Sequence, residues 1–155
     1  MGNKAGMEVM PGFAGVALSM SLSNLGAGYG MAKSGAGIAG IGQRKPHLII
    51  KCLLPVVMAS ILGIYGMIVS VILIKKIDLN NYTWNDGYKH LGSGLCCGFS
   101  SLVAGYTIGI VGDVGVRKIS KQEKLFVGML LVLIFDEAIA LYGMILGIVV
   151  ASKWI

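Results

Sequence analysis

The chain has 155 residues, of which 55% are hydrophobic and only 13% charged, and its mean hydropathy is +0.80. A composition this apolar excludes an ordinary water-soluble domain and predicts an all-α membrane protein. The formal charge of +6 is not a nucleic-acid signature, because the cations cluster in short segments between apolar runs rather than along one solvated face.

Four apolar windows follow one another along the chain, at residues 9–32, 52–74, 91–112 and 125–152. Each is long enough to approach or exceed the span of a hydrocarbon core about 30 Å thick, at about 1.5 Å per helical residue. We therefore expect four transmembrane helices. The first window is taken as a span, since no charged n-region, short apolar core and small-residue cleavage site of a signal peptide precede it.

Lys and Arg are unevenly divided between the two ends of the expected helices. The richer side holds eight of them, namely Lys33, Arg44, Lys45, Lys51, Arg117, Lys118, Lys121 and Lys124. The other side holds five, namely Lys4, Lys75, Lys76, Lys89 and Lys153. Because the richer side is usually cytosolic, we expect the first and third loops in the cytosol and both termini on the lumenal or extracellular side.

The two halves of the chain superpose without a gap when the sequence is shifted by 77 residues. Residues 25–29 then meet 102–106, and residues 65–68 meet 142–145. Such a repeat predicts two helical hairpins fused in one chain. We place the first hairpin at 9–76, a short lumenal loop at 77–88 and the second hairpin at 89–153.

Glycine divides the expected helices into two kinds. Of the 24 glycines, 16 lie within 11–42 or 89–116, whereas five lie in the second and fourth spans and their flanks. Small residues recur at every fourth position, as at Gly15, Ser19, Ser23 and Ala27, and this spacing lets helix backbones approach closely in lipid. Two interpretations fit the pattern: ordinary packing in a four-helix monomer, or a closed ring whose crowded inner layer contains the first and third spans.

Glu137 lies near the middle of the fourth window, at the expected mid-depth of the bilayer. An ionised side chain there costs roughly 3 kcal/mol or more, so an intramembrane carboxylate predicts a functional site. A protonated carboxyl can instead cross lipid as a neutral acid and release its proton where water or a cation is available. Ser60 stands at the equivalent position of the first half, so only one half carries this carboxylate.

Four polar residues are candidates for supporting Glu137, namely Tyr65, Asp136, Asn24 and Ser100. Tyr65 lies at a similar depth on the second span, where its hydroxyl either donates to the carboxylate or packs between helices. Asp136 points in another direction, because successive helix residues differ by about 100°. We favour a neutral, structural Asp136 that is hydrogen-bonded to Asn24, Ser100 or a nearby serine, with a second proton carrier as the alternative.

Several long motifs resemble the c-type proteolipid of eukaryotic vacuolar-type proton ATPases: LGAGYGMAKSGAGIA at 25–39, PVVMASILGIYG at 55–66, GDVGVR at 112–117 and LFVGMLLVLIFDEAIALYG at 125–143. The resemblance covers about residues 13–153 and favours the plain c or c-prime type. It implies a membrane rotor ring in which Glu137 binds the transported proton. One departure is Asp136, since the family usually has a small residue just before the glutamate.

The resemblance also implies the partners and the location. The partners are other proteolipid subunits in the ring, lipid, a stator a-type subunit whose arginine faces Glu137, a central-stalk d-type subunit and the soluble ATPase sector. Protons would pass from the cytosol into a vacuole or another acidic endomembrane compartment. No cofactor or metal is expected, and no phosphate-cradling Gly-Lys-Ser/Thr motif occurs, so ATP hydrolysis is expected on another subunit.

Two other functional classes remain open. A non-ATPase four-helix channel or structural proteolipid explains the spans and the glycines, but not a carboxylate kept in one of two duplicated hairpins. A small proton-coupled drug antiporter also uses a membrane glutamate, but typically on its first helix and without this duplication.

Overall fold

The computed structural model describes residues 2–43, 45–78 and 81–152. Within these ranges the chain forms helices and short connections, without any strand. The helices are α1 (Gly2–Gly42), α2 (Ile49–Cys52), α3 (Leu54–Lys76), α4 (Trp84–Ile119) and α5 (Leu125–Ala151), with a 3₁₀ turn at Pro46–Leu48 just before α2. The all-α prediction is confirmed.

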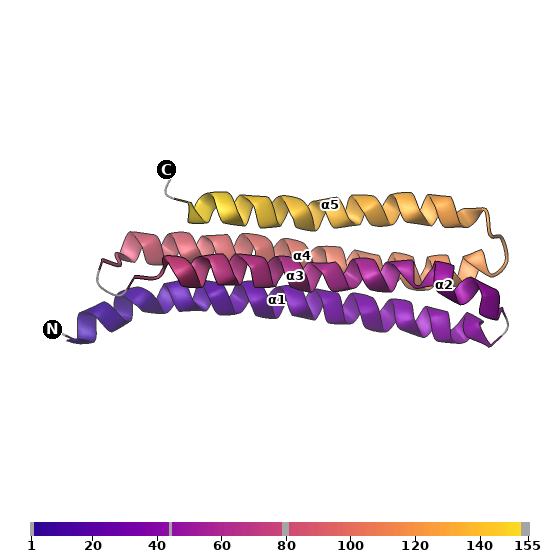
Figure 1. Cartoon of the computed structure of the whole chain (residues 1–155), viewed down its shortest axis with the longest axis horizontal. Helices are drawn as coiled ribbons and strands as arrows, with labels where there is room; N and C mark the ends of the chain where they lie inside the picture. The colour runs from indigo at the N-terminus through magenta and orange to yellow at the C-terminus, as the bar shows by residue number, and fades with distance from the viewer. Residues whose placement is uncertain (1, 44, 79–80, 153–155) are drawn as a thin grey trace.

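The long helices α1, α3, α4 and α5 lie alongside one another, and the chain reverses direction between them (Figure 1). As a result, α1 and α4 run one way, α3 and α5 run the other way, and both termini lie at the same end of the bundle. α1 packs against α3 and α4, while α5 packs against α4 and α3. The short helix α2 leads into α3 at the opposite end from the termini.

Three helical stretches among the described residues are long and apolar enough to cross a membrane, namely Pro46–Lys76, Trp84–Ile119 and Leu125–Ala151. They account for the second, third and fourth expected spans and make this a multi-pass membrane protein. α1 has the length, at 41 residues. It is less apolar, because it contains many Gly and Ser residues and Asn24, whereas α3 and α5 are rich in bulky aliphatic residues. A membrane-crossing α1 stays a prediction.

The closest helix pair is α1 and α4, whose glycines face the backbone of the partner helix. A Cβ atom on Gly94 would overlap the backbone of Gly15, and one on Gly105 would overlap the backbone of Gly26. Residues larger than glycine at these positions would hold the two helices apart. The two glycine-rich helices therefore touch backbone to backbone within one chain.

The pairs α1–α3 and α4–α5 share a cross-helix hydrogen bond. The hydroxyl of Ser70 in α3 donates to the carbonyl oxygen of Val16 in α1, at 3.0 Å. The hydroxyl of Ser93 in α4 donates to the carbonyl oxygen of Gly147 in α5. Positions 93 and 147 are positions 16 and 70 shifted by 77 residues. The same contact therefore occurs in both hairpins, with the serine on opposite members of the pair.

The α1–α3 and α4–α5 connections meet at one end of the bundle. Oε1 of Glu123 lies 3.6 Å from Nε2 of His47, and Oε2 lies 3.7 Å from Nζ of Lys51. Nζ of Lys45 donates to the carbonyl oxygen of Ser120 at 2.7 Å. Lys45 and Lys51, two of the residues expected on the basic side, are thus brought together there. Arg44 and Lys153, which also entered the topology prediction, lie outside the described residues.

Candidate functional site

Glu137 lies on α5, about 18 Å along the helix from its first residue at about 1.5 Å per residue. Both of its carboxyl oxygens are buried and have no hydrogen bond of regular geometry among the described residues. Leu133 and Ala140, one turn before and one turn after it, are fully buried in the apolar core. An ionised carboxylate without a partner would be costly here, whereas a protonated carboxyl is far easier to accommodate.

Tyr65 of α3 is the polar neighbour of Glu137. Its hydroxyl lies within reach for hydrogen bonding and charge interaction with the carboxyl, although the two groups do not form a bond of regular geometry. The ring of Tyr65 also packs against both apolar clusters of the bundle. The position therefore serves interhelical packing and holds a donor close to the carboxyl.

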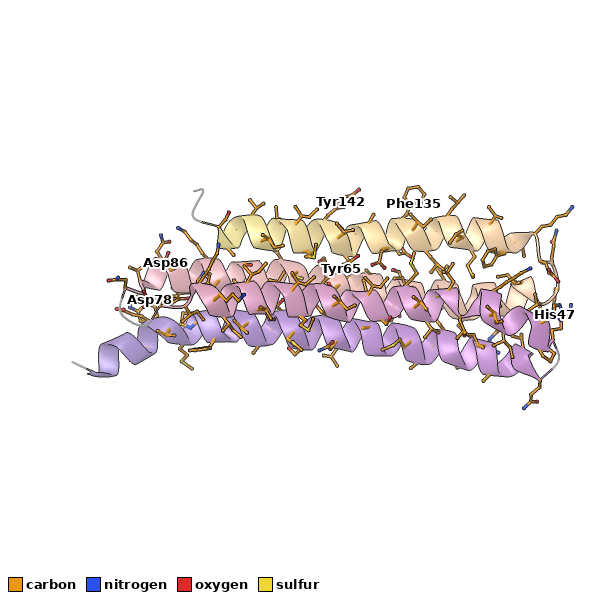
Figure 2. All side chains as sticks on the ribbon, viewed as in Figure 1. His47, Tyr65, Asp78, Asp86, Phe135 and Tyr142 are labelled. Atoms are coloured by element: carbon orange, nitrogen blue, oxygen red, sulfur yellow. The ribbon has the colours of Figure 1, made fainter. Side chains whose placement is uncertain are left out.

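The outer face of α5 is largely apolar, and no other described residue covers it. Phe135 and Tyr142 point away from the bundle, while Tyr65 lies between the helices (Figure 2). The exposed fractions of Phe135 and Tyr142 are 70% and 69%. Phe135 and Tyr142 share this outer face of α5, while Glu137, which lies between them in sequence, turns its carboxyl inward.

Asp136 interacts with a different helix from the one that Glu137 meets. The hydroxyl of Thr107 on α4 lies within reach of its carboxyl, although the two groups do not form a hydrogen bond of regular geometry. Its Oδ2 atom is buried and has no hydrogen bond of regular geometry among the described residues. The two adjacent carboxyl groups of α5 therefore face two different helices. Glu137 faces α3, and Asp136 faces α4.

Asn24 and Ser100 lie elsewhere. Asn24 is exposed on α1, and its Oδ1 atom would be 2.8 Å from a Cβ atom on Gly63 of α3. Ser100 faces Gly143 of α5 and donates to the carbonyl oxygen of Cys97 at 3.0 Å. Gly143 is about 10 Å beyond Asp136 along α5, at about 1.5 Å per residue. Among the described residues, neither Asn24 nor Ser100 forms a hydrogen bond with Asp136.

The internal repeat points to Thr107, which a search for polar residues at mid-depth alone does not single out. Thr107 stands where Gly30 stands in the first half, and Asp136 stands where Ala59 stands. Both positions therefore change from small to polar between the halves. A search for paired departures within the repeat would have found Thr107.

Ser60 occupies the equivalent of the Glu137 position in the first hairpin. It is exposed, and its hydroxyl donates to the carbonyl oxygen of Val57 in its own helix, at 2.7 Å. That hydrogen bond satisfies the serine within α3. The first hairpin therefore has no carboxyl group at this position.

Two stretches of the chain, residues 14–73 and 91–150, match the family model that describes the C subunit of ATP synthase. The two matches are offset by 77 residues, which is the shift of the internal repeat. Together they cover most of the helical bundle.

Curated relatives extend over nearly the whole chain. Over 143 residues, the chain is 56% identical to the V-type proton ATPase c' subunit of Candida glabrata and 54% identical to the V-type proton ATPase c' subunit of Saccharomyces cerevisiae, covering 92% of this chain and 87% of each relative. It is 50% identical to the 16 kDa proteolipid of the V-type proton ATPase of Nephrops norvegicus, covering 92% of this chain and 90% of that protein. The chain therefore belongs to the ATP synthase C-subunit family and, within it, to the V-type proton ATPase proteolipids.

Proposed function

We propose that this chain is a proton-carrying subunit of the membrane rotor of a V-type ATPase, and that Glu137 binds the transported proton. The observation that carries the proposal is the state of the Glu137 carboxyl. Both of its oxygens are buried in mid-helix without a regular hydrogen bond among the described residues. Such a group is accommodated as a neutral acid and pays a large desolvation cost as an anion. It can therefore hold one proton inside the membrane and lose it only where a cation or water compensates the charge.

The proposed cycle needs no other ionisable group on this chain. Glu137 takes up a proton on the cytosolic side and travels through lipid as a neutral acid while the ring turns. It gives up the proton beside an arginine of the stator a-type subunit, from which the proton reaches the lumen. Tyr65 supports the protonated and ionised forms in turn, since a hydroxyl can accept from an acid or donate to a carboxylate.

We further propose four membrane spans, with α1 as the first, arranged as hairpins at 9–76 and 89–153 around a lumenal loop at 77–88. The twofold match to the family model supports the duplication. The glycine contacts between α1 and α4 support their assignment to an inner layer of a ring of proteolipid subunits. A central-stalk d-type subunit and the soluble ATPase sector would turn this ring, and a vacuole or another acidic endomembrane compartment would receive the protons.

The test of the carrier is Glu137→Gln. The amide keeps the shape and the hydrogen-bonding capacity of the protonated acid but cannot release a proton. Vesicles whose rings contain only the variant should lose ATP-driven acidification while the complex stays assembled. The matched control is Ser60→Ala, at the equivalent position of the first hairpin, which should acidify normally because Ser60 bonds only to its own helix.

Acidification by fully Gln-substituted rings would overturn the role of Glu137. Purification separates the remaining classes. Isolation together with a large soluble ATPase sector supports the rotor, whereas a free small oligomer supports a channel or structural proteolipid, and transport without ATP supports an antiporter.

A further inference from the structure

One contact between neighbouring helices recurs in both hairpins, but its residues are small in the first hairpin and polar in the second. In the first hairpin Gly30 of α1 faces Ala59 of α3, so closely that a Cβ atom on Gly30 would lie 2.9 Å from the Cβ atom of Ala59. The equivalent residues in the second hairpin, 77 positions later, are Thr107 of α4 and Asp136 of α5. These two occupy the corresponding places on α4 and α5, and the threonine hydroxyl lies within reach of the carboxyl without a hydrogen bond of regular geometry. A contact between two small residues has thus become a contact between a hydroxyl and an acid.

The hydroxyl of Thr107 has one proton, and its own helix accepts it. Oγ1 donates to the carbonyl oxygen of Ala104 at 2.9 Å, with the carbonyl oxygen of Val103 further away at 3.3 Å. Towards Asp136 the hydroxyl then offers only its lone pairs. An ionised carboxylate is also only an acceptor. A hydrogen bond between the two side chains therefore requires a proton on Asp136.

We propose that Asp136 and Thr107 form a second proton-binding site, the inner site, whose proton is donated by Asp136 to Thr107 and stays bound throughout the transport cycle. The proposal rests on the proposed function only in taking Glu137 as the group that exchanges protons. Asp136 and Glu137 are adjacent in sequence but meet different helices, Thr107 on α4 and Tyr65 on α3.

A resident proton at the inner site has two consequences. It joins α4 to α5 by a hydrogen bond beside the carrier. It also leaves Glu137 free to ionise without a second negative charge next to it, a charge that would be strongly unfavourable in an apolar environment. Thr107 is then a positioning residue, since it acts through Asp136.

The direct test is infrared difference spectroscopy on the assembled complex carrying Glu137→Gln, which removes the signal of the carrier. The spectrum of this variant is compared with that of the double variant Glu137→Gln/Asp136→Asn. The difference should contain the C=O band of a protonated acid, at every pH at which the complex remains assembled. Thr107→Val, which removes the accepting hydroxyl, should shift that band. Carboxylate bands in place of the acid band, or a band indifferent to Thr107→Val, would overturn the inner site.

A second test uses the first hairpin as the template. Thr107→Val should lower the amount of assembled ring, because it leaves the Asp136 proton without an acceptor. The double variant Thr107→Gly/Asp136→Ala installs the residues found at positions 30 and 59 and should restore assembly. If the double variant assembles no better than Thr107→Val, the two residues do not act as a pair.

The transport readout separates this proposal from the carrier assignment. Asp136→Asn stands in for a permanently protonated acid, so the dependence of acidification on pH should keep its shape. Loss of transport in a normally assembled Asp136→Asn complex would show that Asp136 itself exchanges protons and would overturn the resident proton. It would leave the Glu137→Gln result untouched, and only acidification by Glu137→Gln rings would overturn the carrier.

Discussion

The hydroxyl of Tyr82 lies 2.6 Å from Nδ1 of His90, in a buried notch where the α3–α4 connection meets the first turns of α4. The exposed fractions of the two residues are 8% and 5%. Gly12 of α1 forms the floor of the notch, since a Cβ atom there would overlap the Tyr82 hydroxyl. One tyrosine from a connecting segment is therefore held by α1 and α4 together.

Tyr82→Phe should destabilise the chain by about 1–3 kcal/mol, because the ring still fits the notch while Nδ1 of His90 loses its buried partner. Thermal unfolding of the purified chain in detergent, followed by circular dichroism, measures the loss. Tyr88→Phe is the control, since Tyr88 lies nearby in the first turns of α4 but is 61% exposed. Equal unfolding temperatures for the two variants would mean that the hydrogen bond contributes nothing.

The same contact predicts that the chain loses stability at alkaline pH. Burial, followed by the charge of Asp86, raises the pKa of the Tyr82 hydroxyl. The hydroxyl therefore stays protonated at neutral pH and able to share a hydrogen bond with Nδ1 of His90. Since the pKa is higher in the folded chain than in the unfolded chain, the contribution of Tyr82 is complete below its usual pKa of about 10 and declines as pH rises through the raised value. The stability difference between the unmodified chain and Tyr82→Phe should be constant from neutral pH to about pH 10 and shrink as pH rises further.

Tyr65→Phe should slow ATP-driven acidification by about tenfold, because it removes the donor within reach of Glu137 and a hydrogen bond to a charged group contributes about 1.5 kcal/mol. Its ring continues to fill the space between the apolar clusters, so assembly should be preserved. Tyr142→Phe is the matched control, as Tyr142 is the equivalent residue of the second hairpin and is 69% exposed. Equal rates in both variants would leave Tyr65 with a packing role alone.

Gly105→Ala should prevent stable folding, because the added methyl would overlap the backbone of Gly26 and force α1 away from α4. Gly28→Ala provides the control at the equivalent position of the first hairpin, where nothing lies within 4 Å of a Cβ atom. The level of membrane-inserted, protease-resistant chain reports the outcome. A normal level of Gly28→Ala chain with failed ring assembly would place Gly28 at a contact between proteolipids, while stable Gly105→Ala chain would refute the backbone contact.

The topology prediction is tested with tags. A tag after Ile155 should be lumenal and one beside Arg117 or Lys118 cytosolic, as the division of Lys and Arg indicates. In sealed vesicles with the cytosolic side outward, protease should remove only the second tag. Cleavage of the C-terminal tag in intact vesicles would reverse the orientation.

The helices that pack by bulky apolar side chains could be predicted well from the sequence. The apolar windows at 52–74 and 125–152 coincide closely with α3 and α5, because charged residues flank both of them. The window at 9–32 is much shorter than α1, which reaches from Gly2 to Gly42. Polar and basic residues end an apolar run without ending a helix, so hydropathy marks the depth of a span and not the length of its helix.

The candidate site, like the fold, could be predicted from the sequence only in part. Glu137 is evident from the sequence, because a lone carboxylate in an apolar run is costly wherever its side chain points. The neighbour of Asp136 depends on the rotation of α5 against α4, which the composition of either helix leaves open. Mid-depth polarity therefore suggested Asn24 and Ser100, and only the packed helices show Thr107 beside the carboxyl.

The backbone contact between α1 and α4 leaves these two helices little room to move against each other. At Gly15–Gly94 and Gly26–Gly105 the two helices meet without intervening side chains, so no rotamer change can absorb a relative displacement. α3 and α5 meet their neighbours mainly through side chains, although Gly66 of α3 and Gly143 of α5 also lie close to α1 and α4. Tyr65 and Glu137 lie on those two helices. A torque applied to α1 and α4 would therefore reach the Glu137 carboxyl, the proposed proton-binding group, through α3 and α5.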